Sequence, residues 1–388
     1  MFRALKVFFK TSASIKRFSE SATHQRRLVV YSEGSHDWPH LGPIIKNYLE
    51  KFPKESVSFL SSQENDPGLK FSHDRMHGYY IGMGTARTIL FRSLDAKVLL
   101  LSLPDLENLE LKKSSHPVKY VYAFHSINSS HIVYRDRAFE HYPNILTMGP
   151  HHDQELRKEE ELRKIPKRNL IPCGSVKLDT IIADYRKHLL APGEKPEQAI
   201  LLAPSWGECS FAEDPPTIKT LIQEILNSEW KIYLRLHPMT VRRLPQLIPT
   251  ICALFNKAIE SGALKIETDL NDNSSLKNSA VMISDWSGAA TEYAFALEKP
   301  VIFIDMPQKI NNPRWKDFGL NGIEDSIRQK IGKVVRPMDL KQVPTLLNEL
   351  TLSADMMKRQ IKKAYQESIH NPGHAASSAA DALYRLLD

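Results

Sequence analysis

The regular alternation of short apolar runs with longer amphipathic segments constrains the fold of this chain more than any other feature. In the first half, the expected strands are residues 27–32, 56–60, 79–83, 97–101, 119–124, 144–148 and 169–172. Segments with helical spacing follow most of these runs, for example residues 41–52, 85–94 and 152–164. Strands that alternate with helices in this way predict a parallel sheet with helices on both faces.

A second alternating set follows residues 185–198, which contain two prolines, one glycine and several charges without a clear period. This composition indicates an interdomain linker. Beyond it, the expected strands are residues 199–203, 231–236, 264–267, 280–283 and 301–305, and the expected helices are residues 217–227, 246–261 and 289–297. We therefore predict an α/β protein with two Rossmann-like domains, residues 28–190 and residues 191–388, facing each other across a cleft at the carboxyl ends of their strands. The last helix is a candidate to pack back on the first domain.

The composition excludes several classes of protein. With 388 residues, 42% of them hydrophobic, the chain can bury two cores, and no apolar run approaches the roughly 20 residues of a membrane-spanning helix. The three cysteines are widely spaced and form no C-x-x-C pair, so neither a disulfide framework nor a zinc site is expected. P-loop, G-x-S-x-G and H-E-x-x-H motifs do not occur, and the sequence gives no reason to expect a bound metal ion.

The net charge of +7 is concentrated in a basic N-terminal arm, residues 1–27, which holds seven basic residues and one acidic residue. The nearly neutral remainder argues against a nucleic-acid partner. The first ten residues, MFRALKVFFK, interleave apolar and basic side chains. As a short helix they could lie on an anionic membrane, although a loosely packed terminus fits equally well. We expect a cytoplasmic protein, with peripheral attachment to the inner face of the plasma membrane as an open possibility.

The strongest candidate for chemistry is the segment of residues 281–305, VMISDWSGAATEYAFALEKPVIFID. An apolar strand is expected to end in a tight turn, and the amides of the following helix would form a cradle for a phosphate. The candidate phosphate-binding residues are Ser284, Asp285, Ser287, Gly288 and Ala289. Glu292, one turn into the helix, is a candidate for a ribose or polyol hydroxyl. An ordinary strand-turn-helix junction capped by Ser287 is the alternative interpretation.

The segment KIYLRLHPM, residues 231–239, is the second candidate. Residues alternate across a strand, so Arg235 and His237 are expected on the same face near its end. A guanidinium and an imidazole together suit a pyrophosphate. An edge-strand ion pair beside a hydrogen-bonded histidine is the alternative.

The segment YVYAFHSINSSHIVY, residues 120–134, is the third candidate. His125 would stand at the end of a buried strand, where a neutral imidazole could take a proton from an acceptor hydroxyl. Ser126 beside it is a candidate for acceptor contacts. His131 falls inside a helical pattern and is expected to be structural.

Two loops at strand ends are weaker candidates. The loop YSEGSHDWP offers Glu33, His36 and Asp37 for acceptor contacts. The loop LAPSWGECSF offers Ser205 and Trp206 to cover a base or a phosphate, with a packed tryptophan as an equally good interpretation.

Taken in order, these segments resemble the CDP-glycerol glycerophosphotransferase family of wall and capsule polymerases, over residues 28–386. The resemblance rests on VVYSEG, the FHS turn, GSVKLD at residues 174–179, LRLHP and the SDWSGAATEYAFALEKPVIFID segment. It implies a glycosyltransferase-B fold, donor binding by the C-terminal domain, release of CMP, and no cofactor beyond the nucleotide donor. It also implies catalytic roles for His125 and His237, and donor-phosphate contacts for Ser284 and Ser287.

The chain departs from the family pattern in two places. Many members read W-H-G-T followed by a basic residue where this chain has FHSI at residues 124–127. Many read P-T-W-R where it has PSWG at residues 204–207. The missing arginine implies a different donor head group or a different phosphate clamp.

We therefore expect a transferase that moves a glycerol-phosphate or related alditol-phosphate unit from a CDP-alcohol to a hydroxyl of a cell-envelope glycan or lipid-linked acceptor. In this hypothesis His125 is the general base, while Arg235, His237 and residues 284–289 stabilise the phosphate charge. One alternative is a glycosyltransferase or epimerase of the same architecture that uses a UDP- or CMP-sugar in surface polysaccharide synthesis. Another is a non-catalytic peripheral membrane scaffold that binds an anionic surface through residues 1–27.

Overall fold

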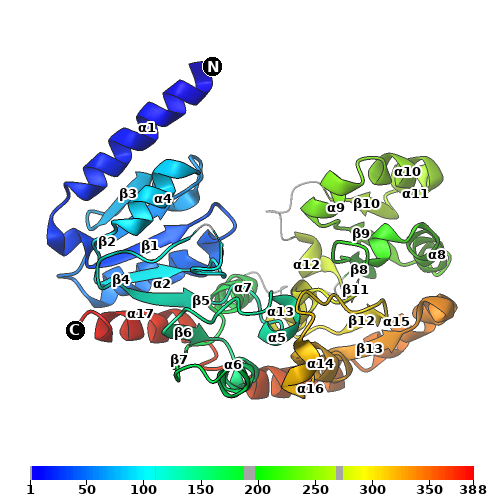
Figure 1. The fold of residues 1–388 in the computed structure, drawn as a ribbon. Helices are drawn as coiled ribbons and strands as arrows, with labels where there is room; N and C mark the ends of the chain where they lie inside the picture. Colours follow the sequence, from blue (N-terminus) through cyan, green and yellow to red (C-terminus); the bar gives the residue numbers. More distant parts are fainter. Residues whose placement is uncertain (1, 110, 188–196, 268–273) are drawn as a thin grey trace. The chain divides into compact units, whose positions relative to one another are not determined.

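The computed structural model describes residues 2–109, 111–187, 197–267 and 274–388, and it divides into two compact units (Figure 1). Unit 1 comprises Met1–Thr180, Asn311–Leu320 and Ser368–Asp388, and unit 2 comprises Ile181–Ile310 and Asn321–Glu367. Most of the predicted linker, residues 188–196, lies outside the described residues. The predicted boundary near residue 190 assigned residues 191–388 to the second domain, with the last helix as a candidate to pack back on the first. The structure groups that helix with unit 1, and also residues 311–320, which the sequence did not indicate.

Unit 1 is built on a seven-stranded parallel sheet with the strand order β3-β2-β1-β4-β5-β6-β7 (Figure 1). Its strands are β1 (Leu28–Ser32), β2 (Val57–Ser61), β3 (Met76–Tyr80), β4 (Val98–Leu101), β5 (Lys119–Ala123), β6 (Asn144–Thr147) and β7 (Asn169–Pro172). Its helices are α1 (Phe2–Ser19), α2 (Trp38–Lys51), α3 (Pro67–Lys70), α4 (Thr85–Arg92), α5 (Ser130–Val133), α6 (Pro150–Arg163), the first part of α7 (Val176–Lys187) and α17 (Ala375–Arg385), with 3-10 turns η1 (Thr23–Arg26) and η3 (Trp315–Phe318). Every residue of β1, β2 and β4 is buried, as expected for strands covered on both faces.

The strand expected at residues 79–83 begins and ends three residues earlier, as β3. Gly82 and Gly84 follow it with φ angles of 65° and 86°, a region that suits glycine and does not continue a strand. They turn the chain into α4 instead.

Helix α17, at the end of the chain, belongs to unit 1. Its apolar face, which includes Ala379 and Leu383, is buried in the same core as α2. The carboxylate of Asp179, from the GSVKLD segment, accepts hydrogen bonds from the backbone amides of Gly373 and Ala375, at 2.8 and 2.9 Å. These amides have no partner within the helix, so Asp179 stabilises its N-terminus.

The second half of α1 packs on unit 1, although the sequence suggested a separate arm. Phe18 is buried edge-on against Tyr79, with ring centroids 5.3 Å apart, and Thr11 and Ser14 are also buried. Phe9, in the first half of the same helix, is 63% exposed. The side chains of residues 1–8, which carry most of the predicted amphipathic pattern, lie outside the described residues.

Unit 2 contains a six-stranded parallel sheet with the order β10-β9-β8-β11-β12-β13 (Figure 1). Its strands are β8 (Ala199–Leu202), β9 (Lys231–Leu234), β10 (Leu264–Ile266), β11 (Val281–Ser284), β12 (Val301–Ile304) and β13 (Gly332–Val335). Its helices are the second part of α7, α8 (Pro215–Leu226), α9 (Pro238–Arg243), α10 (Leu247–Leu254), α11 (Asn256–Glu260), α12 (Ser274–Asn278), α13 (Gly288–Leu297), α14 (Ile323–Ile331), α15 (Val343–Leu352) and α16 (Ala354–Ser368), with 3-10 turns η2 (Phe211–Glu213) and η4 (Pro337–Gln342).

Three features of unit 2 differ from the sequence expectation. The helix expected at residues 246–261 is divided into α10 and α11 at Phe255. Strand β13 was not expected from the sequence, because GKVV is short and begins with glycine. In the structure, two of its four residues are exposed. Strand β9 ends at Leu234, so Arg235 and His237 follow the strand instead of alternating within it. Among the described residues, no helix is both long and apolar enough to cross a membrane.

Candidate functional site

His125 lies at the carboxyl edge of the unit 1 sheet, two residues after β5. Strands β1, β4 and β5 are neighbours, so the loops that follow them meet at this edge. Asp37, in the loop after β1, is buried and accepts hydrogen bonds from the Ser102 hydroxyl and the Glu33 amide, both at 2.7 Å. The hydrogen bonds hold the carboxylate at the strand ends.

Burial lowers the pKa of His125 below its usual 6.5, and the carboxylate of Asp37 opposes this shift. The imidazole is therefore neutral near pH 7 and able to accept a proton. Its neighbour His40 lies edge-on, with ring centroids 6.2 Å apart, and burial also lowers the pKa of His40 well below 6.5. Two neutral imidazoles consequently lie side by side at this edge.

The other predicted residues of unit 1 surround this pair in different ways. Glu33 and Ser126 are half-buried, and the Ser126 hydroxyl accepts a hydrogen bond from the Asn128 amide at 3.2 Å. The side chain of His36 is 72% exposed, with Nε2 3.6 Å from Asp37. Their contacts with an acceptor remain predictions.

His131 has the structural role expected for it. Its side chain is fully buried and forms an ion pair with Glu155, the two atoms lying 3.2 Å apart. Burial raises the pKa of Glu155, and the interaction with this histidine outweighs that effect and lowers the pKa to about 2. The ring also packs on Phe318, at 5.1 Å between centroids, so His131 anchors a segment of unit 1 far away in sequence.

In unit 2, Asp285 organises the loop that follows β8. It is fully buried at the end of β11 and accepts hydrogen bonds from the amides of Ser205 at 2.9 Å and Phe211 at 3.4 Å. Burial raises its pKa, and these hydrogen bonds oppose the shift. The buried hydroxyl of Ser284 donates to the carbonyl of Ala203 at 2.6 Å. Asp285 and Ser284, both predicted to contact phosphate, thus form hydrogen bonds with the backbone of the protein. Contact of either residue with a phosphate stays a prediction.

The N-terminus of α13 is the accessible part of the predicted phosphate cradle. Ser287 caps the helix, its hydroxyl accepting a hydrogen bond from the Ala289 amide at 3.3 Å. Ser287 and Gly288 are half-buried and Ala289 is exposed, so small side chains leave the beginning of the helix accessible to an anion, although the Ala289 and Ala290 amides already bond Ser287. Glu292 lies half-buried one turn further on.

Trp206, His237 and Lys309 form a cluster at the same edge of unit 2. The rings of Trp206 and His237 are nearly parallel, with centroids 5.8 Å apart, and the Lys309 ammonium lies 3.3 Å from the centroid of Trp206. His237 Nδ1 accepts a hydrogen bond from the Met239 amide at 3.1 Å. This bond assigns the proton of the neutral imidazole to Nε2. Burial, and secondarily Lys309, lowers the pKa of His237, so near pH 7 it presents a hydrogen-bond donor.

Arg235 forms the ion pair that the sequence left open as an alternative. Its Nε lies 2.6 Å from an oxygen of Glu267, which also accepts a hydrogen bond from Ser275. Its contact with a pyrophosphate remains a prediction.

Sequence reasoning missed four residues near these edges. Ser102 and Lys309 follow strands, and this placement was the only signal for them. His40 was hidden inside a helix three residues after Asp37. Arg328 lies with its guanidinium 4.0 Å from the Trp286 ring and 3.0 Å from Asp305, so it braces the turn before α13 from a separate helix.

Solved structures of enzymes share the fold of the whole chain. The wall teichoic acid polymerase TagF has 14% identity and a TM-score of 0.59, covering 99% of this chain and 98% of its own. A variant of TagF soaked with CDPG gives 15% and 0.60 over the same shares. The glycosyltransferase from Rickettsia africae gives 11% and 0.53, covering 93% of this chain and 98% of its own. The fold is of the glycosyltransferase-B type.

A UDP-GlcNAc 2-epimerase from Methanocaldococcus jannaschii, in complex with UDP-GlcNAc and UDP, also has this fold. It is 15% identical, with a TM-score of 0.55, and the match covers 92% of this chain and 99% of the epimerase. No family model matches the chain, and no curated protein matches its sequence. The predicted likeness to the wall polymerases is confirmed at the level of the fold.

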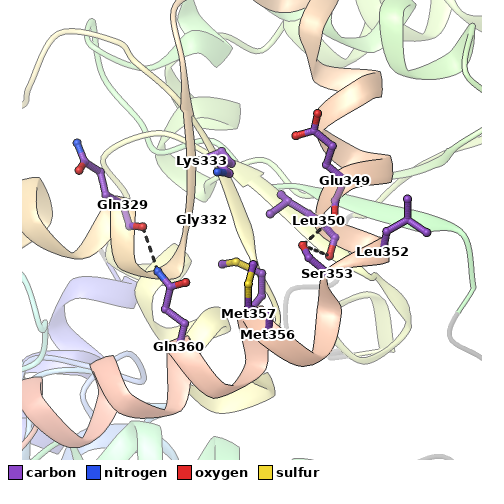
Figure 2. Close-up of a pocket in the computed structure, with 10 residues that line it drawn as sticks. All are labelled: Gln329, Gly332, Lys333, Glu349, Leu350, Leu352, Ser353, Met356, Met357 and Gln360. Atoms are coloured by element: carbon purple, nitrogen blue, oxygen red, sulfur yellow. Dashed lines mark hydrogen bonds between the residues drawn. The ribbon is translucent and has the colours of Figure 1, made fainter.

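A surface cavity of about 470 Å³ in unit 2 lies elsewhere, beside the beginning of β13 (Figure 2). Its lining includes Leu352, Met356 and Gln360, the last hydrogen-bonded to the Gln329 carbonyl at 3.5 Å. The amino end of a parallel strand is opposite the edge that carries the candidate residues. In the described part of the chain, no three histidine, cysteine or acidic side chains are grouped to hold a metal ion.

Proposed function

We propose that the protein is a transferase that moves a glycerol-phosphate or related alditol-phosphate unit from a CDP-alcohol to a hydroxyl of a cell-envelope glycan or lipid-linked acceptor, with release of CMP. The observation that carries this proposal is His125, held neutral by burial beside the carboxylate of Asp37. The donor class follows from the motif resemblance and from the CDPG named with TagF, whose fold the chain shares.

Unit 1 is assigned the base. His125 takes the proton of the acceptor hydroxyl as its oxygen attacks the distal phosphorus of the donor, and the bond from that phosphorus to the CMP oxygen breaks. Asp37 stabilises the imidazolium that forms, and Ser102 and the Glu33 amide keep the carboxylate in place. Glu33, His36 and Ser126 are proposed to contact the acceptor.

Unit 2 is assigned the donor. The accessible N-terminus of α13, the Ser287 hydroxyl and the Nε2 proton of His237 are suited to oxygens of a diphosphate. Asp285 and Ser284 are proposed to act through the loop of residues 203–211 that they hold. Glu292 is proposed to bind a hydroxyl of the ribose or the polyol.

Thermal unfolding with a panel of ligands tests the donor class, because a ligand that binds only the native state raises the melting temperature. The panel is CDP-glycerol, CDP-ribitol, CDP, CMP, UDP-sugars and CMP-sugars. The proposal requires a CDP-alcohol to stabilise the protein more than CDP or CMP does. CMP release from the same CDP-alcohol in the presence of an acceptor then tests turnover.

A nucleotide-sugar enzyme is the second candidate, and the fold shared with the UDP-GlcNAc 2-epimerase favours it. Stabilisation by a UDP- or CMP-sugar, without an effect of CDP-alcohols, would replace the first proposal with this one.

The exposed part of α1 is proposed to contact an anionic membrane. Phe9 is 63% exposed, and residues 1–8 add two basic and several apolar residues to the same helix. Each basic residue near an anionic surface contributes about 1 kcal/mol of binding. Deleting residues 2–8 is therefore expected to weaken binding to phosphatidylglycerol vesicles by about tenfold or more, measured by co-sedimentation.

Vesicles of phosphatidylcholine serve as the control for this prediction, since they lack the anionic charge. The deletion leaves Phe18 and its packing on Tyr79 intact, so the melting temperature should change little. Equal binding of the full and shortened chains to anionic vesicles would refute a role for this segment.

A further inference from the structure

The cluster of Trp206, His237 and Lys309 contains a cation that has no anionic partner among the described residues. Lys309 comes five residues after the end of β12, and Trp206 lies in the loop after β8. Strand β11 lies between these two strands and leads into α13. The lysine therefore belongs to the same edge as the N-terminus of that helix.

Within the described residues, the Lys309 ammonium makes no hydrogen bond and no ion pair. The two carboxylates whose charge acts on it are engaged elsewhere. Glu213 pairs with Arg243 at 3.2 Å and accepts a hydrogen bond from the Gly207 amide, and Asp285 holds the loop amides. Burial lowers the pKa of Lys309. A half-buried ammonium with three unused donors is stabilised when an anion binds it.

The face of Trp206 beneath this ammonium is covered. At 3.3 Å from the ring centroid the cation leaves no room for a base on that face. The ring instead attracts the ammonium through its π electrons and fixes its position. Trp206 is thus a positioning residue for the lysine.

The backbone after Trp206 accounts for the absence of an arginine there. Gly207 has a φ angle of 97°, which a side chain other than glycine rarely adopts. A basic side chain at this position would be strained in this loop. Lys309 reaches the tryptophan from a different strand end.

We propose that Lys309, held over Trp206, binds the diphosphate of the donor in unit 2. It takes the place of the arginine that follows the tryptophan in many members of the family that this chain resembles. This inference rests on the proposed use of unit 2 for a nucleotide donor. Lys309 is then the residue that makes the protein bind a nucleoside diphosphate more tightly than the nucleoside alone.

Calorimetric titration of the full chain with cytidine, CMP and CDP tests the assignment, using Lys309→Gln and Lys309→Arg. A charged hydrogen bond to a phosphate predicts that Lys309→Gln weakens CDP binding between about tenfold and a hundredfold and changes cytidine binding less than about twofold. Lys309→Arg should keep most of the CDP affinity. Trp206→Leu should weaken CDP similarly, and the double variant should lose little more than either single variant.

Lys265→Gln is the matched control, because Lys265 is also in unit 2 and also lies over an aromatic ring, 5.9 Å from the centroid of Tyr233. It should bind CDP like the wild type. Undiminished CDP binding by Lys309→Gln would overturn the inference and leave the proposed function standing.

The same titrations with uridine and UDP separate the two proposals. If the wild type binds UDP instead of CDP and Lys309→Gln weakens UDP, the CDP-alcohol proposal fails and the assignment of Lys309 holds. If neither diphosphate binds the wild type more tightly than its nucleoside does, both proposals fail.

Discussion

Replacing His125 with alanine is expected to lower turnover by about a thousandfold while donor affinity stays within about twofold of the wild type. A positioned general base contributes between about a hundredfold and ten-thousandfold to a rate, and His125 belongs to unit 1, whereas the residues assigned to the donor belong to unit 2. Turnover is measured as CMP release from the CDP-alcohol, and donor affinity by calorimetry. His116→Ala is the matched control, because His116 is an exposed histidine in the loop before β5.

The pH profile gives an independent check on the same residue. Only the neutral imidazole can accept a proton, so the rate should rise with pH through the pKa of His125 and level off above it. Burial lowers that pKa, so the midpoint should lie below 6.5. Asp37→Asn removes the charge that raises the pKa, so the midpoint should move to still lower pH. Retained turnover in His125→Ala, or an unchanged midpoint in Asp37→Asn, would remove these residues from the base role.

Replacing Asp285 with asparagine is expected to destabilise unit 2 by about 1–3 kcal/mol and to abolish most donor binding. The carboxylate accepts from the amides of Ser205 and Phe211, and an asparagine NH₂ group would face one of these donors. A buried donor left without an acceptor costs about 1–3 kcal/mol. Unfolding in urea, followed by tryptophan fluorescence, measures the loss of stability. Trp286 is adjacent to Asp285 in sequence, and Trp206 lies in the loop of residues 203–211 that Asp285 holds.

Asp317→Asn is the control for this substitution. Asp317 forms an exposed ion pair with Arg314, so its loss should change stability by less than about 0.5 kcal/mol. Wild-type stability in Asp285→Asn would show that the loop of residues 203–211 is held by other contacts.

Much of the fold could be predicted because apolar runs in a parallel sheet leave a clear signal. Strands such as β1 and β12 are continuous apolar segments that end in polar turns, and both lie within a residue of their expected bounds. Strand β13 carried no such signal, since Lys333 and Val334 are exposed at the edge of the sheet.

The candidate site could be predicted only in part. His125, Asp37 and Ser287 were found because each follows an apolar run, where strand ends collect functional groups. The same reasoning could not show that Ser284 and Asp285 point back into the protein. Their hydrogen-bond partners, Ala203 and Ser205, are about eighty residues away in sequence.

The sequence by itself determined the class of fold and the strand ends where chemistry is concentrated, because periodicity and turn residues act over a few neighbouring positions. The tertiary structure decided which of the candidate groups are free to bind a ligand. It alone placed Lys309 over Trp206 and His40 beside His125, because these contacts join strand ends and helices that are neighbours only in the folded sheet. Burial and charge act through space, and the pKa values of both histidines follow from that environment.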